Sequence, residues 1–284
     1  MQKIKIRGLF TTVGIVCPPN EELAQAPALI VALKNLAQAA GGPAPQPAMP
    51  NVDAISALEN QSGNGLLLEL FTRCGELTTL VGAWKGMAEA IQRRLPAWTQ
   101  LAMLIRHAQE LEPYATLQAE IQAILDQRSL LADPDPVRPV LDRTADRLRL
   151  ALNAHLTAYT EEYAAQMAGL ATDAHWQALD AEQQDRLIGD QHIEPSPSLD
   201  LSTAEKLGAA LNDCDLRRWI ERTHALRNRF DAVRLEAARL LKPDVVRVHL
   251  PKRTLNTAEE VKAWVLDVER VLLDRLQSGP VMPD

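Results

Sequence analysis

The sequence predicts an all-α protein, a multi-helix bundle containing two long heptad helices, and three observations lead to this class. Hydrophobic residues make up 46% of the chain but aromatic residues only 4%, and the hydrophobic ones are mostly Leu and Ala, which favour helices over sheets. The 18 prolines cluster between stretches of helical periodicity instead of interrupting them. Heptad spacing of apolar residues recurs twice, over Leu70–Leu95 and over Leu216–Leu240.

The N-terminal region, residues 1–50, is expected to hold a strand, a helix and a linker. Residues Ile4–Arg7 alternate between apolar and basic, which predicts a short strand. Asn20 is expected to open a helix that runs to about Ala39, and Pro27 inside it would kink the helix or move its start. Four prolines in residues 41–50 indicate a stiff, extended linker.

The central region, residues 51–242, is expected to be a helical bundle or coiled-coil region. It begins with a short helix over Asp53–Glu59 and a turn at Gly63–Gly65. Pro96 should end the first heptad helix and open another to about Glu112, and Pro113 should open a third to about Leu131. The apolar seam of the first heptad helix is Leu70, Cys74, Leu77, Val81, Trp84, Ala88, Ile91 and Leu95.

A breaker at residues 133–136, Asp-Pro-Asp-Pro, separates these helices from a long one over Val137–Leu170. Two short helices should follow, around His175–Leu179 and Asp180–Leu187. Capping-box spacing at Asp180 and Gln183, and again at Ser202 and Glu205, marks two helix starts. Asp213 is expected to cap the second heptad helix, which runs to Pro243 and carries Leu216, Trp219, Thr223, Leu226, Phe230, Val233, Ala237 and Leu240 on its seam.

The C-terminal region, residues 243–284, is expected to hold a short strand over Val245–Leu250 and an amphipathic helix to Leu276. A capping box of Thr257 and Glu260 opens that helix, and Gly279-Pro280 stops it. A two-stranded ribbon between Ile4–Arg7 and Val245–Leu250 would tie the chain ends together. The two heptad helices fit either an antiparallel coiled-coil arm or a bundle of ordinary length, because both need the same spacing.

Charge and composition limit the classes of partner. A net charge of −7 and a pI near 5.5 do not favour general attraction to nucleic acid or anionic membranes. The longest apolar run, Ala28–Leu33, is far shorter than a membrane span, and no apolar segment of a signal peptide follows the basic start. Three widely spaced cysteines fit reduced thiols. We therefore expect a cytoplasmic protein without a membrane partner.

No motif for catalysis, cofactor binding or metal binding is found, so the sequence assigns no catalytic residue, no cofactor and no metal ligand. The six histidines are scattered singly, and neither CxxC nor GxSxG occurs. Gly82–Gly86 encloses Lys85 but lacks the spacing of a phosphate-binding loop and lies inside a heptad helix. The expectation is a chain that is not an enzyme.

The second heptad helix has a local charge bias that predicts a contact surface. Over residues 213–242, eight basic residues outnumber five acidic ones within an acidic chain. A basic helix contacts a nucleic-acid backbone or an acidic partner, although a solvated coiled-coil flank has the same composition. The candidate contact residues are Arg217, Arg218, Arg222, Arg229 and Arg234, with Lys252 and Arg253 extending the surface.

Four stretches of the chain together resemble one family, the BrxC proteins of bacterial BREX systems. They are residues 33–50, with Asn35-Leu-Ala and Ala40-Gly41-Gly42; residues 84–107, with Arg93-Arg94-Leu95-Pro96-Ala97-Trp98 and Ile105-Arg106-His107; residues 124–137, with Gln127-Arg128-Ser-Leu-Leu131 and Asp133-Pro-Asp-Pro136; and residues 257–281, with Glu260-Val261, Trp264 and Gly279-Pro280-Val281. The resemblance spans most of the chain, but the matching motifs mark where helices begin and end and contain no catalytic residues.

BrxC proteins, like the related PglY, are large P-loop ATPases of anti-phage defence that act with methyltransferase and phosphatase-like partners. This chain is much shorter and has no Walker motif, so the resemblance implies a helical C-terminal region used for assembly or for contact with other defence proteins. No ATP-site residue can be transferred to it. The alternatives are a nucleic-acid-contacting module that uses the basic helix over residues 213–242, and a coiled-coil scaffold unrelated to defence. Self-association through the heptad seams is a further expectation.

Overall fold

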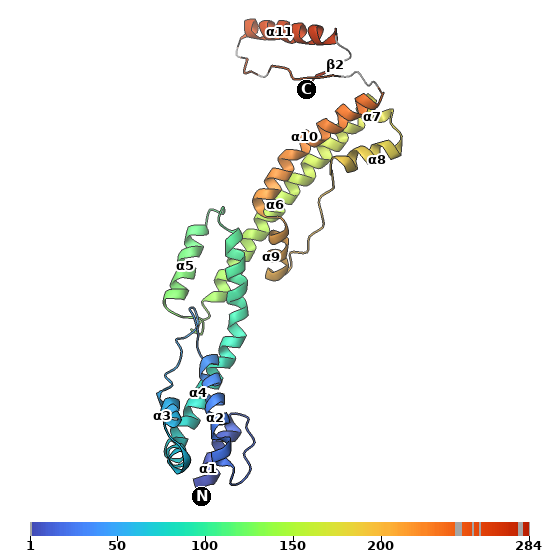
Figure 1. Ribbon diagram of the computed structural model, residues 1–284. Helices are drawn as coiled ribbons and strands as arrows, with labels where there is room; N and C mark the ends of the chain where they lie inside the picture. Colours follow the sequence, from blue (N-terminus) through green and yellow to red (C-terminus); the bar gives the residue numbers. More distant parts are fainter. Residues whose placement is uncertain (1, 242–245, 252, 256, 278–280, 284) are drawn as a thin grey trace. The chain divides into compact units, whose positions relative to one another are not determined.

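The computed structural model describes residues 2–241, 246–251, 253–255, 257–277 and 281–283, and it confirms the all-α class. The chain forms two compact units: unit 1 comprises residues 1–149 and 201–209, and unit 2 comprises residues 150–200 and 210–284. Two helices, α6 (Val137–Ala171) and α9 (Ala204–Asp213), each contribute residues to both units. Figure 1 labels the helices and colours the chain from blue at the N-terminus to red at the C-terminus.

Unit 1 is built around a long helix, α4, which covers Gly63–Leu104. Three helices pack on its first half, namely α1 (Gln2–Thr12), α2 (Glu22–Ala39) and α3 (Asp53–Glu59). A one-turn 3₁₀ helix (Ile105–His107) and α5 (Tyr114–Asp126) follow α4. The first heptad seam is largely buried in this core, where its Leu70, Leu77 and Trp84 pack with residues of α1, α2 and α3.

The predicted strand over Ile4–Arg7 is wrong, because these residues lie inside α1. Ile6, Leu9 and Phe10 are spaced by three and four residues and are all buried, whereas Ile4 is 64% exposed. The alternation of residues 4 to 7 is too short to outweigh this helical spacing, which continues past Gly8 and forms a face against α2 and α4.

The predicted helix end at Pro96 is also wrong, because α4 continues without a break through Pro96 to Leu104. Proline removes one backbone hydrogen bond from a helix interior but does not terminate a helix that is held by packing on both sides. Here Ile91, Leu101 and Leu104, before and after the proline, are all buried. The predicted turn at Gly63–Gly65 instead forms the first turn of the same helix, and Gly63 has a φ of +54°.

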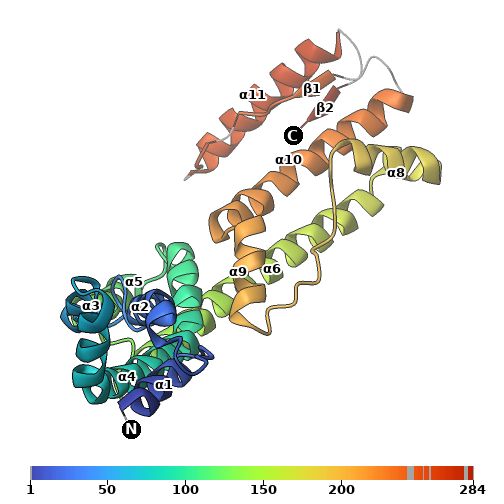
Figure 2. The same cartoon turned by 60° about the horizontal axis from the view of Figure 1, so that its bottom comes forward.

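Unit 2 pairs the second part of α6 with α10 (Leu216–Leu241), and the two run side by side in Figures 1 and 2. Two short helices, α7 (Ala174–Gln177) and α8 (Ala181–Asp190), contact α10. Edge-to-face aromatic pairs join the two long helices: Tyr159 with Trp219 at 5.5 Å and Tyr163 with Phe230 at 6.0 Å between ring centroids. Since each heptad helix has partners within its own unit, the bundle expectation accounts for both seams.

Two predicted helix caps are displaced. The Thr203 hydroxyl, and not that of Ser202, accepts the Lys206 N–H at 3.2 Å before α9. Residue 213 closes α9, and the carboxylate of Asp215 accepts the Arg218 N–H at 2.8 Å at the start of α10. A cap must sit in the last non-helical residue. Because α9 begins at Ala204, that residue is Thr203, and because α9 continues to Asp213, Asp213 is helical and cannot cap α10.

The capping box at the start of α8 is confirmed and gives a stability prediction. The Asp180 carboxylate accepts the Gln183 N–H at 2.8 Å, and the Gln183 side chain accepts the Asp180 N–H at 3.1 Å. Asp180→Ala should therefore lower the free energy of unfolding of unit 2 by about 1 kcal/mol, measured by urea unfolding. Asp180→Asn keeps an acceptor oxygen and should retain most of that stability, so an equal loss in both variants would contradict the capping role.

The C-terminal part of unit 2 is a β-α-β element of two short parallel strands and one helix. Strand β1 (Val246–Val248) pairs in parallel with β2 (Val281–Pro283), and α11 (Ala258–Leu276) connects them. Parallel strands need such a crossover. The predicted pairing of residues 245–250 with residues 4–7 is wrong, because residues 4–7 are helical and β1 pairs with β2. The Thr257–Glu260 capping box is confirmed, whereas Val245 and the Gly279-Pro280 stop lie outside the described residues.

Candidate functional site

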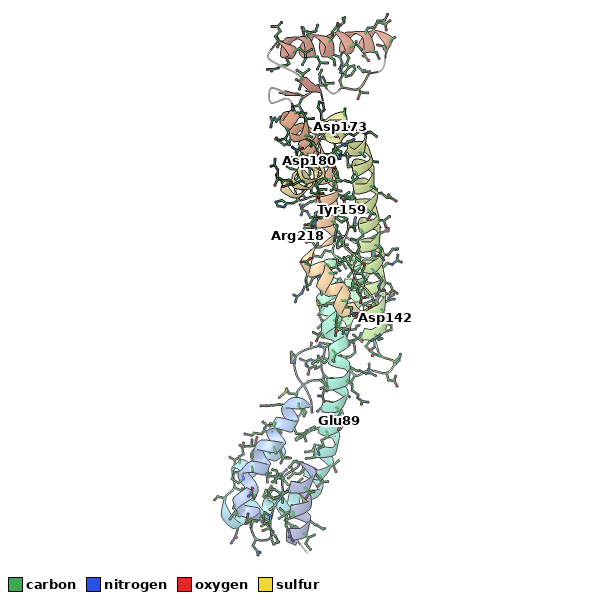
Figure 3. The ribbon with its side chains drawn as sticks, turned by 90° about the vertical axis from the view of Figure 1, so that its right-hand side faces the viewer. Glu89, Asp142, Tyr159, Asp173, Asp180 and Arg218 are labelled. Carbon is green, nitrogen blue, oxygen red and sulfur yellow. The ribbon has the colours of Figure 1, made fainter. Side chains whose placement is uncertain are left out.

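The candidate contact surface lies on α10, where the structure brings together three of the arginines predicted from the sequence. Arg218, Arg222 and Arg229 line an open hollow of 510 Å³. Their numbers differ by four and seven, so the three side chains share one side of the helix. Figure 3 labels Arg218 on α10 and Tyr159 on α6. The remaining lining residues are Asp213, Cys214, Glu221 and Ala225.

Two of these guanidinium groups are held in place by neighbours. The Arg222 guanidinium carbon lies 5.0 Å from the centroid of the buried Trp219 ring, a cation–π contact. Arg229 donates to the backbone carbonyl of His192 at 2.9 Å. An arginine carries five N–H donors, so these contacts orient both groups and leave donors for a ligand.

A buried tyrosine lies beneath the arginines. The Tyr159 hydroxyl donates to the Glu194 carbonyl at 2.8 Å. Burial raises the pKa of Tyr159 above its ordinary value, while the charges of Arg222 and Arg229 act in the opposite direction. The phenol is therefore neutral at physiological pH, and it links the loop after α8 to the α6–α10 pair.

The other predicted contact residues do not belong to the hollow. Arg217 forms an exposed ion pair with Glu221 at 3.2 Å, and Arg234 is paired with Asp231 at 2.7 Å and bonded to Gln166 at 3.1 Å. Arg253 donates to the Glu260 carbonyl at 3.3 Å in the C-terminal element, and Lys252 lies outside the described residues. Charge composition alone does not distinguish arginines that are paired from those that line a hollow.

Sequence reasoning missed the non-basic members of the hollow. Cys214 is buried, and the Arg222 guanidinium approaches its sulfur at 3.9 Å. Together with Arg218, Arg222, Ala225 and Arg229, it forms a series with steps of four, four, three and four residues. That periodicity is present in the sequence. The heptad seam has the same spacing and lies one residue further along, so the spacing was assigned to the seam alone.

A second exposed surface lies on α11. Among its described residues none is buried, and five large apolar side chains are exposed, with fractions from 44% for Val261 to 65% for Leu266. The Trp264 indole donates to the Pro251 carbonyl at 2.6 Å, which fixes that ring beside the loop after β1. The exposed apolar residues are Val261, Val265, Leu266, Leu273 and Leu276.

Arginines and aspartates that line a second hollow are paired with one another. A hollow of 590 Å³ in unit 1 is lined by Arg138, Asp142, Asp146 and Arg149, but these charges form two ion pairs, at 3.2 Å and 2.7 Å. The buried Glu22 carboxylate lies 3.6 Å from the Arg7 guanidinium, and its Oε1 accepts no hydrogen bond from the described residues. Burial, followed by the charges of Glu22 and Glu21, raises the pKa of the Cys17 thiol, which keeps it in the unreactive protonated form.

In the part of the chain that the structure describes, no group of three or more His, Cys, Asp or Glu side chains is placed to hold a metal ion. None of the described helices combines the length and apolar character that a membrane span requires. The Gly82–Gly86 segment is helical throughout and thus has no free backbone N–H groups for a phosphate.

Comparison with protein-family models, with curated proteins and with solved structures finds no match to this chain.

Proposed function

We propose that this chain is a helical assembly and interaction region of a BrxC-like ATPase in bacterial phage defence. The observation that carries the interaction role is the exposed apolar surface of α11, the residues Val261, Val265, Leu266, Leu273 and Leu276. Large apolar side chains gathered on one capped helix are typical of a surface that another protein covers. The resemblance of four stretches of the sequence to BrxC proteins supports the family.

The partners implied by this proposal are the other BREX proteins, a methyltransferase and a phosphatase-like component. A second copy of this chain is the other partner that an exposed apolar helix such as α11 would accept. Contact between helices of this type gains free energy from the apolar area removed from water, at about 25 cal/mol per Å². Substituting a central leucine of α11 should therefore weaken whichever association the surface supports.

The proposal is tested by measuring association of the purified chain with purified BREX methyltransferase and phosphatase-like proteins, and with itself by light scattering. Leu266→Asp combined with Leu273→Asp should weaken binding at least about tenfold, since it places charges in an apolar contact. Leu150→Asp is the matched control, because Leu150 is also 65% exposed but lies on α6. Absence of any association, or equal loss in the control, would overturn the interaction role.

The assignment to a region without ATPase chemistry gives a separate prediction. The purified chain should neither bind nor hydrolyse ATP, because its sequence lacks the GxxxxGK[ST] loop that cradles phosphates. Nucleotide binding can be followed by calorimetry and turnover by release of inorganic phosphate. Turnover that co-elutes with the chain through successive purification steps would contradict the proposal.

A second candidate function, contact with nucleic acid, is favoured by one observation: Arg218, Arg222 and Arg229 face the same hollow on α10. Guanidinium groups bind phosphates through paired N–H donors. In this role the chain would bring the defence proteins to DNA. The two functions use different surfaces, so each can be tested without disturbing the other.

A further inference from the structure

Three arginines on one side of α10 line the hollow, and the inference drawn from them rests on the nucleic-acid contact proposed above. The three arginines are unequal in environment, since Arg218 and Arg222 are exposed and Arg229 is half-buried. At a rise of about 1.5 Å per residue, they extend over about 16 Å of the helix. A nucleic-acid strand in a duplex carries one phosphate per about 3.4 Å of its axis, so a strand along α10 would meet each arginine with a separate phosphate.

The lining of the hollow favours phosphates over a peptide. Only Cys214 and Ala225 among the lining residues are apolar, and Cys214 is itself buried. An acidic peptide needs apolar pockets or a backbone partner to gain affinity from its side chains and main chain. A phosphodiester backbone needs only positioned cations and N–H donors, which is what this hollow offers.

The carboxylates at the hollow do not cancel its charge. Glu221 is paired with Arg217, which does not itself line the hollow, and the Asp215 carboxylate caps the start of α10. Asp213 is the remaining acid in the lining. The first turn of a 26-residue helix adds a positive partial charge at the end of the hollow that contains Arg218.

We infer that the α10 hollow binds the phosphodiester backbone of a nucleic acid through Arg218, Arg222 and Arg229 without reading the bases. Arg222 and Arg229 are positioned before binding by Trp219 and by the His192 carbonyl, which lowers the entropy lost when the ligand binds. Arg218 makes no side-chain hydrogen bond or ion pair with the described residues and so is the arginine most available to a phosphate.

The experiment measures fluorescence anisotropy of labelled DNA with the full 284-residue chain and its variants at several salt concentrations. Three neutralised phosphates predict a slope of log K against log salt of about −2.7 for duplex DNA, or about −2 for a single strand. Two oligonucleotides of equal length and unrelated sequence should bind with equal affinity. A strong preference for one sequence would overturn the claim that the bases are not read.

The decisive comparison is Arg218→Glu against Arg227→Glu. Both residues are exposed on α10 and the substitutions change the net charge equally, but only Arg218 lines the hollow; nine residues separate them, which places Arg227 on the opposite side of the helix. Arg218→Glu should weaken DNA binding by about tenfold and reduce the salt slope by about 0.9 on duplex DNA. Arg227→Glu should leave the slope unchanged. Far-UV circular dichroism and thermal melting of both variants verify that the helix remains folded.

The outcomes separate this inference from the function on which it rests. Binding that falls equally in both variants would overturn the hollow as the site but leave nucleic-acid contact standing. No DNA binding at low salt would overturn both. Displacement of the DNA by inorganic polyphosphate but not by polyglutamate would support a phosphate site, and the reverse order would replace the nucleic acid by an acidic protein as the ligand.

Discussion

Replacing Trp219 by Ala is expected to lower the free energy of unfolding of unit 2 by about 3–5 kcal/mol. The indole is 2% exposed, packs edge-to-face on Tyr159 at 5.5 Å and supports the Arg222 guanidinium at 5.0 Å. Its removal leaves a cavity between α6 and α10 and takes away one wall of their aromatic contact. Urea unfolding followed by far-UV circular dichroism measures the loss.

Trp219→Phe is the informative companion to this variant. The Trp219 indole N–H is buried and has no hydrogen-bond partner among the residues that the structure describes, and an unsatisfied buried donor costs about 1–3 kcal/mol. Phenylalanine removes that donor while keeping an aromatic ring against Tyr159, so its loss should be less than half that of alanine. Equal losses in the two variants would show that the volume of the indole and not its ring contact supports unit 2.

Gly41→Ala is the second substitution with a large expected effect, and it acts on unit 1. A Cβ atom at residue 41 would lie 2.6 Å from the Ala48 carbonyl oxygen and 2.9 Å from the Met49 Cα. Both are backbone atoms, so the loop that closes over Gly41 must shift. Forcing extra volume into a packed site costs about 1–3 kcal/mol, which a lowered urea midpoint for unit 1 would reveal.

Gly82→Ala is the matched control, and it is expected to raise the free energy of unfolding instead of lowering it. Gly82 is exposed in the middle of α4, and an added Cβ would meet no atom within 4 Å. Alanine in a helix interior is more stable than glycine by about 0.5–1 kcal/mol, because glycine loses more backbone freedom on folding. If Gly41→Ala were as harmless as Gly82→Ala, the close approach of residues 48 and 49 to Gly41 would be wrong.

The helices of this chain were predictable where the periodic pattern was long. The long helix over residues 137–170 and the second heptad helix were placed to within about one or two residues, because many apolar residues at one period leave a single solution. Residues 4–7 were mistaken for a strand because four residues fit both periods. Pro96 predicts a helix end because proline removes a backbone hydrogen bond. The helix continues because side chains before and after Pro96 are packed in the core.

The candidate site was predictable in part. The charge bias of residues 213–242 directed attention to α10, and three of its arginines line the hollow. The ion pairs of Arg217 and Arg234 were not predictable, since whether a charged side chain is paired depends on its rotamer and on residues from other helices. Arg234, for example, bonds to Gln166, which is 68 residues away in the sequence.

The sequence by itself determined that the chain folds into helices, where the long ones lie, which face of each is apolar, and that the phosphate-binding loop of an ATPase is missing. These properties depend on the period and type of neighbouring residues. Only the tertiary structure decided which strand pairs with β1, that α4 passes through its proline, and which arginines meet in one hollow. Those outcomes depend on contacts between residues distant in the sequence, whose free energy exceeds the local preferences that sequence patterns report.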